Sequence, residues 1–136
     1  MYMFKKLEEL LNNSYSPYSG FRVASIVVDK DGNEYKGVNV ESAAYSTTNC
    51  AERVAIQSAV ANGMQAGDLV EVHLLASKTN GEDVGFAAPC GSCRQVINEI
   101  GTKETKVIIY NTKGETKNTT IDELLPLSFG SDNLNV

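Results

Sequence analysis

The sequence predicts an α/β fold built on a mixed sheet, with helices on the faces of that sheet. Strand-like and helix-like segments alternate in the order strand, helix, strand, helix, strand, and crossover helices between strands favour parallel pairing. The Asp31-Gly32 pair is a strong hairpin signal, which indicates that the first two strands are antiparallel. Because 136 residues suffice for one core, we expect residues 1–136 to form a single domain.

The chain is predicted to open with a short helix followed by the hairpin. Four apolar residues between Phe4 and Leu11 recur at helical spacing, and the segment NNSYSPYSG that follows is rich in residues that break helices. Residues 21–28 are largely apolar and β-branched, and residues 35–40 alternate in polarity. Both patterns are typical of strands.

A narrow stripe of small residues marks the next helix. The segment ends near Asn62-Gly63, where glycine is a natural stop signal. The residues that recur at helical period are Ala51, Val54, Ala55, Ser58 and Ala59. So narrow a stripe predicts that this helix packs closely against the sheet.

The second half of the chain is predicted to continue the alternation. Residues 70–76 and 106–110 are expected to be strands, and residues 90–100 a helix between them. The segment NTKGET is expected to form a turn, and residues 120–125 a short helix.

Composition and charge exclude several classes of function. Twelve basic residues against seventeen acidic ones give a net charge of −5, whereas binding to long nucleic acid requires a positive surface. No apolar run approaches the roughly 20 residues of a membrane span, and residues 1–11 contain no apolar stretch long enough to be expected to act as a signal peptide. We therefore expect no nucleic-acid or membrane partner and a cytoplasmic location. In that reducing compartment the three cysteines should be thiols or metal ligands.

The cysteines are spaced as ligands of one metal ion. Cys90 and Cys93 form a C-x-x-C pair at the start of a predicted helix, which allows two thiolates to reach the same ion. Cys50 lies at the corresponding position of the other helix, so three thiolates could converge. Soft sulfur ligands favour Zn²⁺, and three protein ligands leave a fourth position for water.

Charged residues next to the cysteines suggest chemistry at this ion. Glu52 lies two residues beyond Cys50, where a carboxylate could take a proton from water and return it to a substrate. Three thiolates accumulate negative charge that would blunt the acidity of that water. We expect Arg53, Arg94 and the positive ends of the two helix dipoles to screen this charge.

Each of these residues also has a plainer interpretation. The C-x-x-C pair could be a redox couple, and the arginines could be solvated charges on helix faces. Glu52 could form a capping box with Asn49 as the N-cap residue. His73 could complete a closed, purely structural zinc site of three cysteines and one histidine.

The assembled pattern C-x-E…P-C-x-x-C resembles that of the zinc-dependent nucleoside and nucleobase deaminases. More narrowly, the chain resembles the small homotetrameric cytidine deaminases, because SYSPYSGF, GVNVESAAY, TNCAER, PCGSCRQV and ELLPLSFG stand in that family's order. The resemblance implies a three-layer α/β/α fold with a five-stranded mixed sheet and one zinc ion per subunit. It also implies hydrolytic deamination of free cytidine and deoxycytidine to uridine and deoxyuridine, with release of ammonia, as in pyrimidine salvage.

The resemblance further implies which residues bind the nucleoside. Asn39 and Glu41 match the family's ribose-binding residues, and an amide and a carboxylate suit sugar hydroxyls. Phe21 matches the aromatic residue that packs on the pyrimidine ring. Ala51 matches the residue whose backbone contacts the base.

Two further matches concern assembly. Tyr45 and Phe129 match positions that family members contribute to a neighbouring subunit's pocket, so the resemblance implies a homotetramer whose active sites are completed by neighbours. The chain departs from the common pattern at Arg22, Ser25 and Ser42, none of which belongs to the expected metal site.

Other deaminase activities share the same metal-binding frame. One is deamination of a cytosine-containing antibiotic nucleoside, although the NVE stretch favours a ribose. Another is editing of polynucleotides, which the acidic balance and short chain disfavour.

Overall fold

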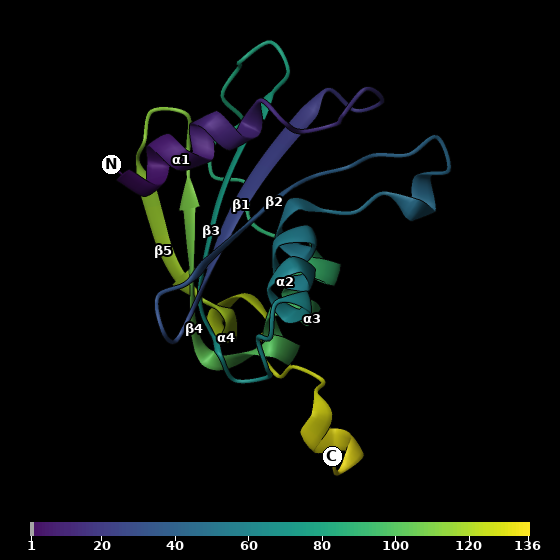
Figure 1. Ribbon diagram of the computed structural model, residues 1–136, viewed down its shortest axis with the longest axis vertical. Coiled ribbons are helices and arrows are strands. Elements are labelled where there is room, and N and C mark those ends of the chain that lie inside the picture. Colours follow the sequence, from purple (N-terminus) through teal and green to yellow (C-terminus); the bar gives the residue numbers. More distant parts are fainter. Residues whose placement is uncertain (1) are drawn as a thin grey trace.

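The computed structural model describes residues 2–136, and the predicted helices and strands occur in it in the predicted order (Figure 1). Two short 3₁₀ turns supplement these elements, at Tyr45–Thr47 and Ser131–Leu134. The α-helices and strands are α1 (Tyr2–Leu11), β1 (Phe21–Asp29), β2 (Glu34–Val38), α2 (Ala51–Ala61), β3 (Leu69–Lys78), α3 (Gly91–Ile100), β4 (Gly101–Tyr110), β5 (Thr116–Thr120) and α4 (Ile121–Leu124).

The five strands form one mixed sheet in the order β2-β1-β3-β4-β5. Strands β3 and β4 are parallel because α3 crosses over between them, and the other pairs are antiparallel. The predicted mixed sheet and hairpin are thus confirmed. The residue pattern missed β5, because the polar segment TKNTT lacks the alternation that marks a half-buried strand.

Helices cover both faces of the sheet, as the resemblance implied (Figure 1). On one face α1 buries Phe4 and Leu7 against Ala24 and Leu75 of the central strands. On the other face α2, α3 and α4 share a second apolar cluster with the sheet. Within residues 2–136, no helix is both long and apolar enough to span a bilayer.

Helix α2 lies unusually close to β2, as its stripe of small residues predicted. Ala51, Ala55 and Ala59 are fully buried. A Cβ atom added to Gly37 of β2 would lie 2.4 Å from the carbonyl oxygen of Ala51 and 2.4 Å from the amide nitrogen of Ala55. Only glycine allows this approach, which fixes the first turn of α2 against the sheet.

Candidate active site

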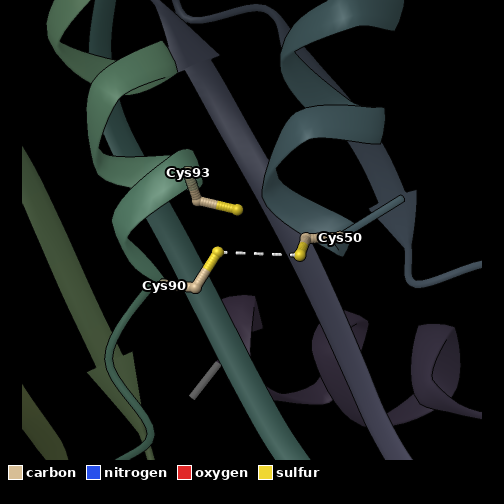
Figure 2. A group of neighbouring side chains, drawn as sticks. All are labelled: Cys50, Cys90 and Cys93. Carbon is tan, nitrogen blue, oxygen red and sulfur yellow. Dashed lines mark hydrogen bonds between the residues drawn. The ribbon is translucent and has the colours of Figure 1, made fainter. Parts of the chain in front are cut away.

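The starts of α2 and α3 bring the three cysteines together. Cys50 is the N-cap residue of α2, Cys90 is the N-cap residue of α3, and Cys93 lies in the first turn of α3. Figure 2 shows their side chains converging, and the three sulfur atoms lie within 4.8 Å of one another. The Sγ atoms of Cys50 and Cys90 are 3.8 Å apart.

This arrangement fits a zinc ion with three protein ligands. Sulfur atoms bound to one tetrahedral zinc at about 2.3 Å would lie about 3.8 Å apart, which matches the closest sulfur pair. The thiol donor set is the soft one that zinc favours. In the described part of the chain, the cluster of side chains near enough to share an ion consists of these three cysteines.

His73 lies on the opposite face of the sheet from the thiols. Its Nδ1 is 2.9 Å from the hydroxyl of Tyr110, and its Nε2 is 2.9 Å from a carboxylate oxygen of Glu71. Tyr110 stacks on Phe4 of α1, which places this group in the α1 layer. The alternative of a closed site completed by His73 is therefore wrong.

Arg53 contacts the sulfur of Cys50 directly. Its guanidinium donates a hydrogen bond to Sγ at 3.3 Å. The pKa of Cys50 falls to about 5, first because the thiol of Cys93 hydrogen-bonds to it and then because Arg53 does, while burial opposes the shift. This geometry suits the charge-screening role expected of Arg53.

Arg94 makes different contacts. Its Nε donates to the carbonyl oxygen of Pro89 and its terminal nitrogen to that of Leu124, both at 2.8 Å. These partners are backbone carbonyls rather than sulfur atoms, so screening of a thiolate by Arg94 stays a prediction.

Glu52 is buried in the first turn of α2 and lines the cavity beside the thiols. Its side chain is only 4% exposed. Burial raises the pKa of Glu52 to about 7, and the negative charge of Cys50 adds to the shift against the opposing pull of the helix backbone. The capping-box alternative is wrong, because the N-cap residue is Cys50 and the amide of Asn49 instead donates to Gln57.

A cavity of about 400 Å³ extends from the thiols to the N-terminal part of β1. Its lining combines side chains of the metal site with side chains expected to bind a nucleoside. The first group comprises Cys50, Glu52 and Cys90, and the second comprises Phe21, Asn39 and Glu41.

Asn39 is buried and held in one orientation by its neighbours. Its Oδ1 accepts hydrogen bonds from the amide of Val23 at 2.9 Å and from the hydroxyl of Ser14. Its Nδ2 donates to the carbonyl oxygen of Phe21 at 2.8 Å. Since a side-chain amide has two N–H donors, one remains for a ligand.

Glu41 is fixed by donors from the loop before β1. Its Oε1 accepts from the amides of Tyr18 at 3.0 Å and Ser19 at 3.1 Å, and its Oε2 accepts from the hydroxyl of Ser19. Burial alone would raise the pKa of Glu41, but these hydrogen bonds outweigh it and lower the pKa. Glu41 therefore faces the cavity as a carboxylate.

Strand β2 stops at Val38, so Asn39 lies beyond it and not in the predicted strand to Val40. Glu41 follows in the same segment. Isolated bridges from Val40 to Tyr15 and Asn49 hold this segment extended. Sequence reasoning missed the supporting serines at 14 and 19, because their partners lie 22 or more residues away and no local pattern connects them.

The side chains of the remaining expected residues do not line this cavity. Ala51 is fully buried at the first position of α2. Tyr45 is 76% exposed and packs edge-on against Tyr18, at 6.1 Å between ring centroids. Phe129 is 59% exposed on the C-terminal segment beyond α4.

Comparison with known proteins agrees with this geometry. The family model of the cytidine and deoxycytidylate deaminase zinc-binding region matches residues 1–109. The chain belongs to this family.

Individual family members are similar over nearly the whole chain. The cytidine deaminase of Halalkalibacterium halodurans is 35% identical over 133 residues, which cover 98% of this chain and 96% of that protein. That of Sporosarcina psychrophila is 40% identical over 121 residues, covering 89% and 84%. The crystal structure of cytidine deaminase from Burkholderia pseudomallei aligns with a TM-score of 0.86 at 35% identity, covering 94% and 97%. The resemblance drawn from the sequence motifs is thus confirmed, as is a zinc-binding domain.

Proposed function

We propose that this protein hydrolytically deaminates free cytidine and deoxycytidine to uridine and deoxyuridine, with release of ammonia. One observation carries the proposal: a single cavity is lined by a buried glutamate, by two of the three convergent thiols, and by an amide and a carboxylate. The glutamate and thiols suit hydrolysis, and the amide and carboxylate suit sugar hydroxyls. This activity would serve pyrimidine salvage.

The proton transfers fall to Glu52. The three cysteines would hold a zinc ion, which would acidify a water molecule so that it could serve as the nucleophile near neutral pH. The Glu52 carboxylate takes a proton from that water and delivers it to the ring nitrogen beside the amine-bearing carbon. The hydroxide left behind adds to that carbon, and Glu52 then moves a proton from the added hydroxyl to the amino group, so that the C–N bond breaks and ammonia leaves. Burial of Glu52 supports this role, because a carboxyl whose pKa lies near 7 can both accept and donate.

Other residues in and beside the cavity bind and orient the nucleoside. The ring of Phe21 packs against the pyrimidine, and the backbone of Ala51 contacts the base. The free N–H of Asn39 donates to a sugar hydroxyl, and the carboxylate of Glu41 accepts from one. Because these contacts lie away from the reacting carbon, their binding energy serves to position the ring for attack.

Arg53 partly offsets the negative charge of the thiolates at the metal site. Its hydrogen bond to Cys50 withdraws negative charge from a thiolate that would otherwise make the bound water less acidic.

The active unit is proposed to be a cytoplasmic homotetramer of single-domain subunits, each holding one zinc ion. The exposure of Tyr45 and Phe129, two aromatic side chains expected to complete neighbouring pockets, supports this assembly. The net charge of −5 disfavours polynucleotide substrates. Sedimentation equilibrium measures the mass directly, and a monomer with full activity would contradict the shared sites.

The test compares the native protein with the Glu52→Ala variant. Zinc content is measured first, and conversion of cytidine to uridine is then followed by ultraviolet absorbance. We expect the variant to keep its zinc and to lose at least ~100-fold in turnover, the lower end of general acid–base contributions. Equal turnover by both proteins would contradict the mechanism. Parallel assays with a cytosine-containing antibiotic nucleoside would show whether that substrate is preferred.

A further inference from the structure

The two ligands that α3 supplies are fixed in different ways. Cys93 is completely buried, so surrounding side chains restrict its rotamer. Cys90 is exposed and makes no side-chain cap interaction with the helix it begins. The direction of its sulfur therefore depends on the backbone conformation at residue 90.

Arg94 holds the backbone on both sides of Cys90. Its amide N–H donates to the carbonyl oxygen of Cys90 at 2.9 Å, the first hydrogen bond of α3. Its side-chain Nε donates to the carbonyl oxygen of Pro89 at 2.8 Å. The two peptide groups that flank the Cα atom of Cys90 are thus bound to one residue, which restricts both backbone dihedrals of the cysteine.

A second nitrogen of the Arg94 guanidinium binds a different element of the fold. It donates at 2.8 Å to the carbonyl oxygen of Leu124, at the end of α4. Helix α4 is itself secured by the buried side chain of Ile121 and by a capping box between Thr120 and Glu123. Arg94 therefore connects the loop before Cys90 to an element with its own core contact.

We propose that Arg94 is a positioning residue for zinc, which keeps Cys90 in ligand geometry through hydrogen bonds to backbone carbonyls. The role depends on the planar guanidinium, in which two separate nitrogens each donate to one of the carbonyls, an arrangement that the single nitrogen of lysine does not reproduce. It differs from charge screening, which any cation at this position would provide. The inference rests on the zinc site of the proposed function and not on the identity of the substrate.

The experiment measures how fast zinc leaves the holoprotein for a chromogenic chelator. Arg94→Lys keeps the charge, Arg94→Met removes it, and Gln95→Ala is the matched control on the same helix, because Gln95 donates only to the carbonyl oxygen of Phe129. Groups that support metal ligands typically contribute 10–100-fold to metal affinity. We expect zinc release to accelerate ~10-fold or more in both Arg94 variants and less than about twofold in the control.

Several results would overturn the proposal. Native release from Arg94→Lys with fast release from Arg94→Met would assign screening instead, and native release from both would leave Arg94 without a role at the metal. If Arg94→Met does not fold, the Co²⁺ absorption spectrum of Arg94→Lys decides, and an unchanged spectrum counts against positioning. A wild-type protein that holds zinc but leaves cytidine unchanged refutes the proposed substrate only, whereas one that binds no zinc refutes both proposals.

Discussion

Helices α2 and α3 begin alike but are anchored by opposite means. Each starts with a cysteine at its N-cap position and directs its positive end at the shared sulfur cluster. Helix α2 is fixed by close packing, because the backbone of Ala51 and Ala55 lies directly against Gly37. The start of α3 is fixed by hydrogen bonds from Arg94 to carbonyls. The comparison teaches that the ligands of one metal site can be positioned in two ways: by close packing in the core for Cys50, and by hydrogen bonds for Cys90.

The largest effect on stability is expected from Gly37→Ala, which disrupts the close packing between β2 and the first turn of α2. The new methyl group would lie 2.4 Å from two backbone atoms of α2, which cannot rotate away. Helix α2 must shift and carry Cys50 with it. We expect the free energy of unfolding to fall by about 3 kcal/mol, the upper end of the usual cost of overpacking, as measured by urea denaturation.

Gly91→Ala is the matched control at the start of α3. An added Cβ atom there meets nothing within 4 Å. The change should alter the free energy of unfolding by no more than about 0.5 kcal/mol, since alanine is favoured in helices. If the two variants proved equally stable, α2 would not be held by close packing.

A smaller effect is expected on the far side of the sheet, where His73→Phe tests whether the metal site is independent of the α1 layer. The change leaves the hydroxyl of Tyr110 and the carboxylate of Glu71 without their histidine partner. The free energy of unfolding should fall by about 1–2 kcal/mol, because a buried polar group loses its hydrogen bond. Zinc content, measured by atomic absorption, should stay at the native level. Loss of zinc would revive a structural role for His73 at the metal.

Among the destabilising variants, the smallest effect is expected from Thr120→Ala, which weakens the hydrogen-bonded support of α3 indirectly. The threonine caps α4, to which Arg94 is bound. Loss of an N-cap side chain costs about 1 kcal/mol in thermal or urea unfolding. Zinc release should accelerate only slightly, because Ile121 still holds α4 in the core. Acceleration as large as that of the Arg94 variants would mean that α4, and not the guanidinium, sets the geometry of Cys90.

Most of the fold could be predicted because its signals are local. The small-residue stripe of α2, the Asp31-Gly32 turn and the alternating order of helices and strands are all contiguous in the sequence. Strand β5 could not be predicted from its residues, because it is held at the sheet edge by pairing with β4 and carries no apolar face. Its existence was implied by family resemblance alone.

The candidate site likewise contains residues that the sequence could predict and contacts that it could not. The cysteines and Glu52 could be recognised from their spacing at two helix starts. The contacts of Arg94 could not, because its adjacency to Cys93 suggested a sulfur partner while Leu124 lies 30 residues away. Likewise, the hydroxyls of Ser14 and Ser19 reach Asn39 and Glu41 only after the chain has folded.

X-ray absorption spectroscopy at the zinc edge of the purified protein tests the central claim most directly. Three cysteines from two helix starts should give three sulfur neighbours at about 2.3 Å and one oxygen neighbour at about 2.0 Å. A protein without zinc, or a zinc ion enclosed by four protein ligands, would contradict the account, because no position would remain for the water that Glu52 is proposed to deprotonate.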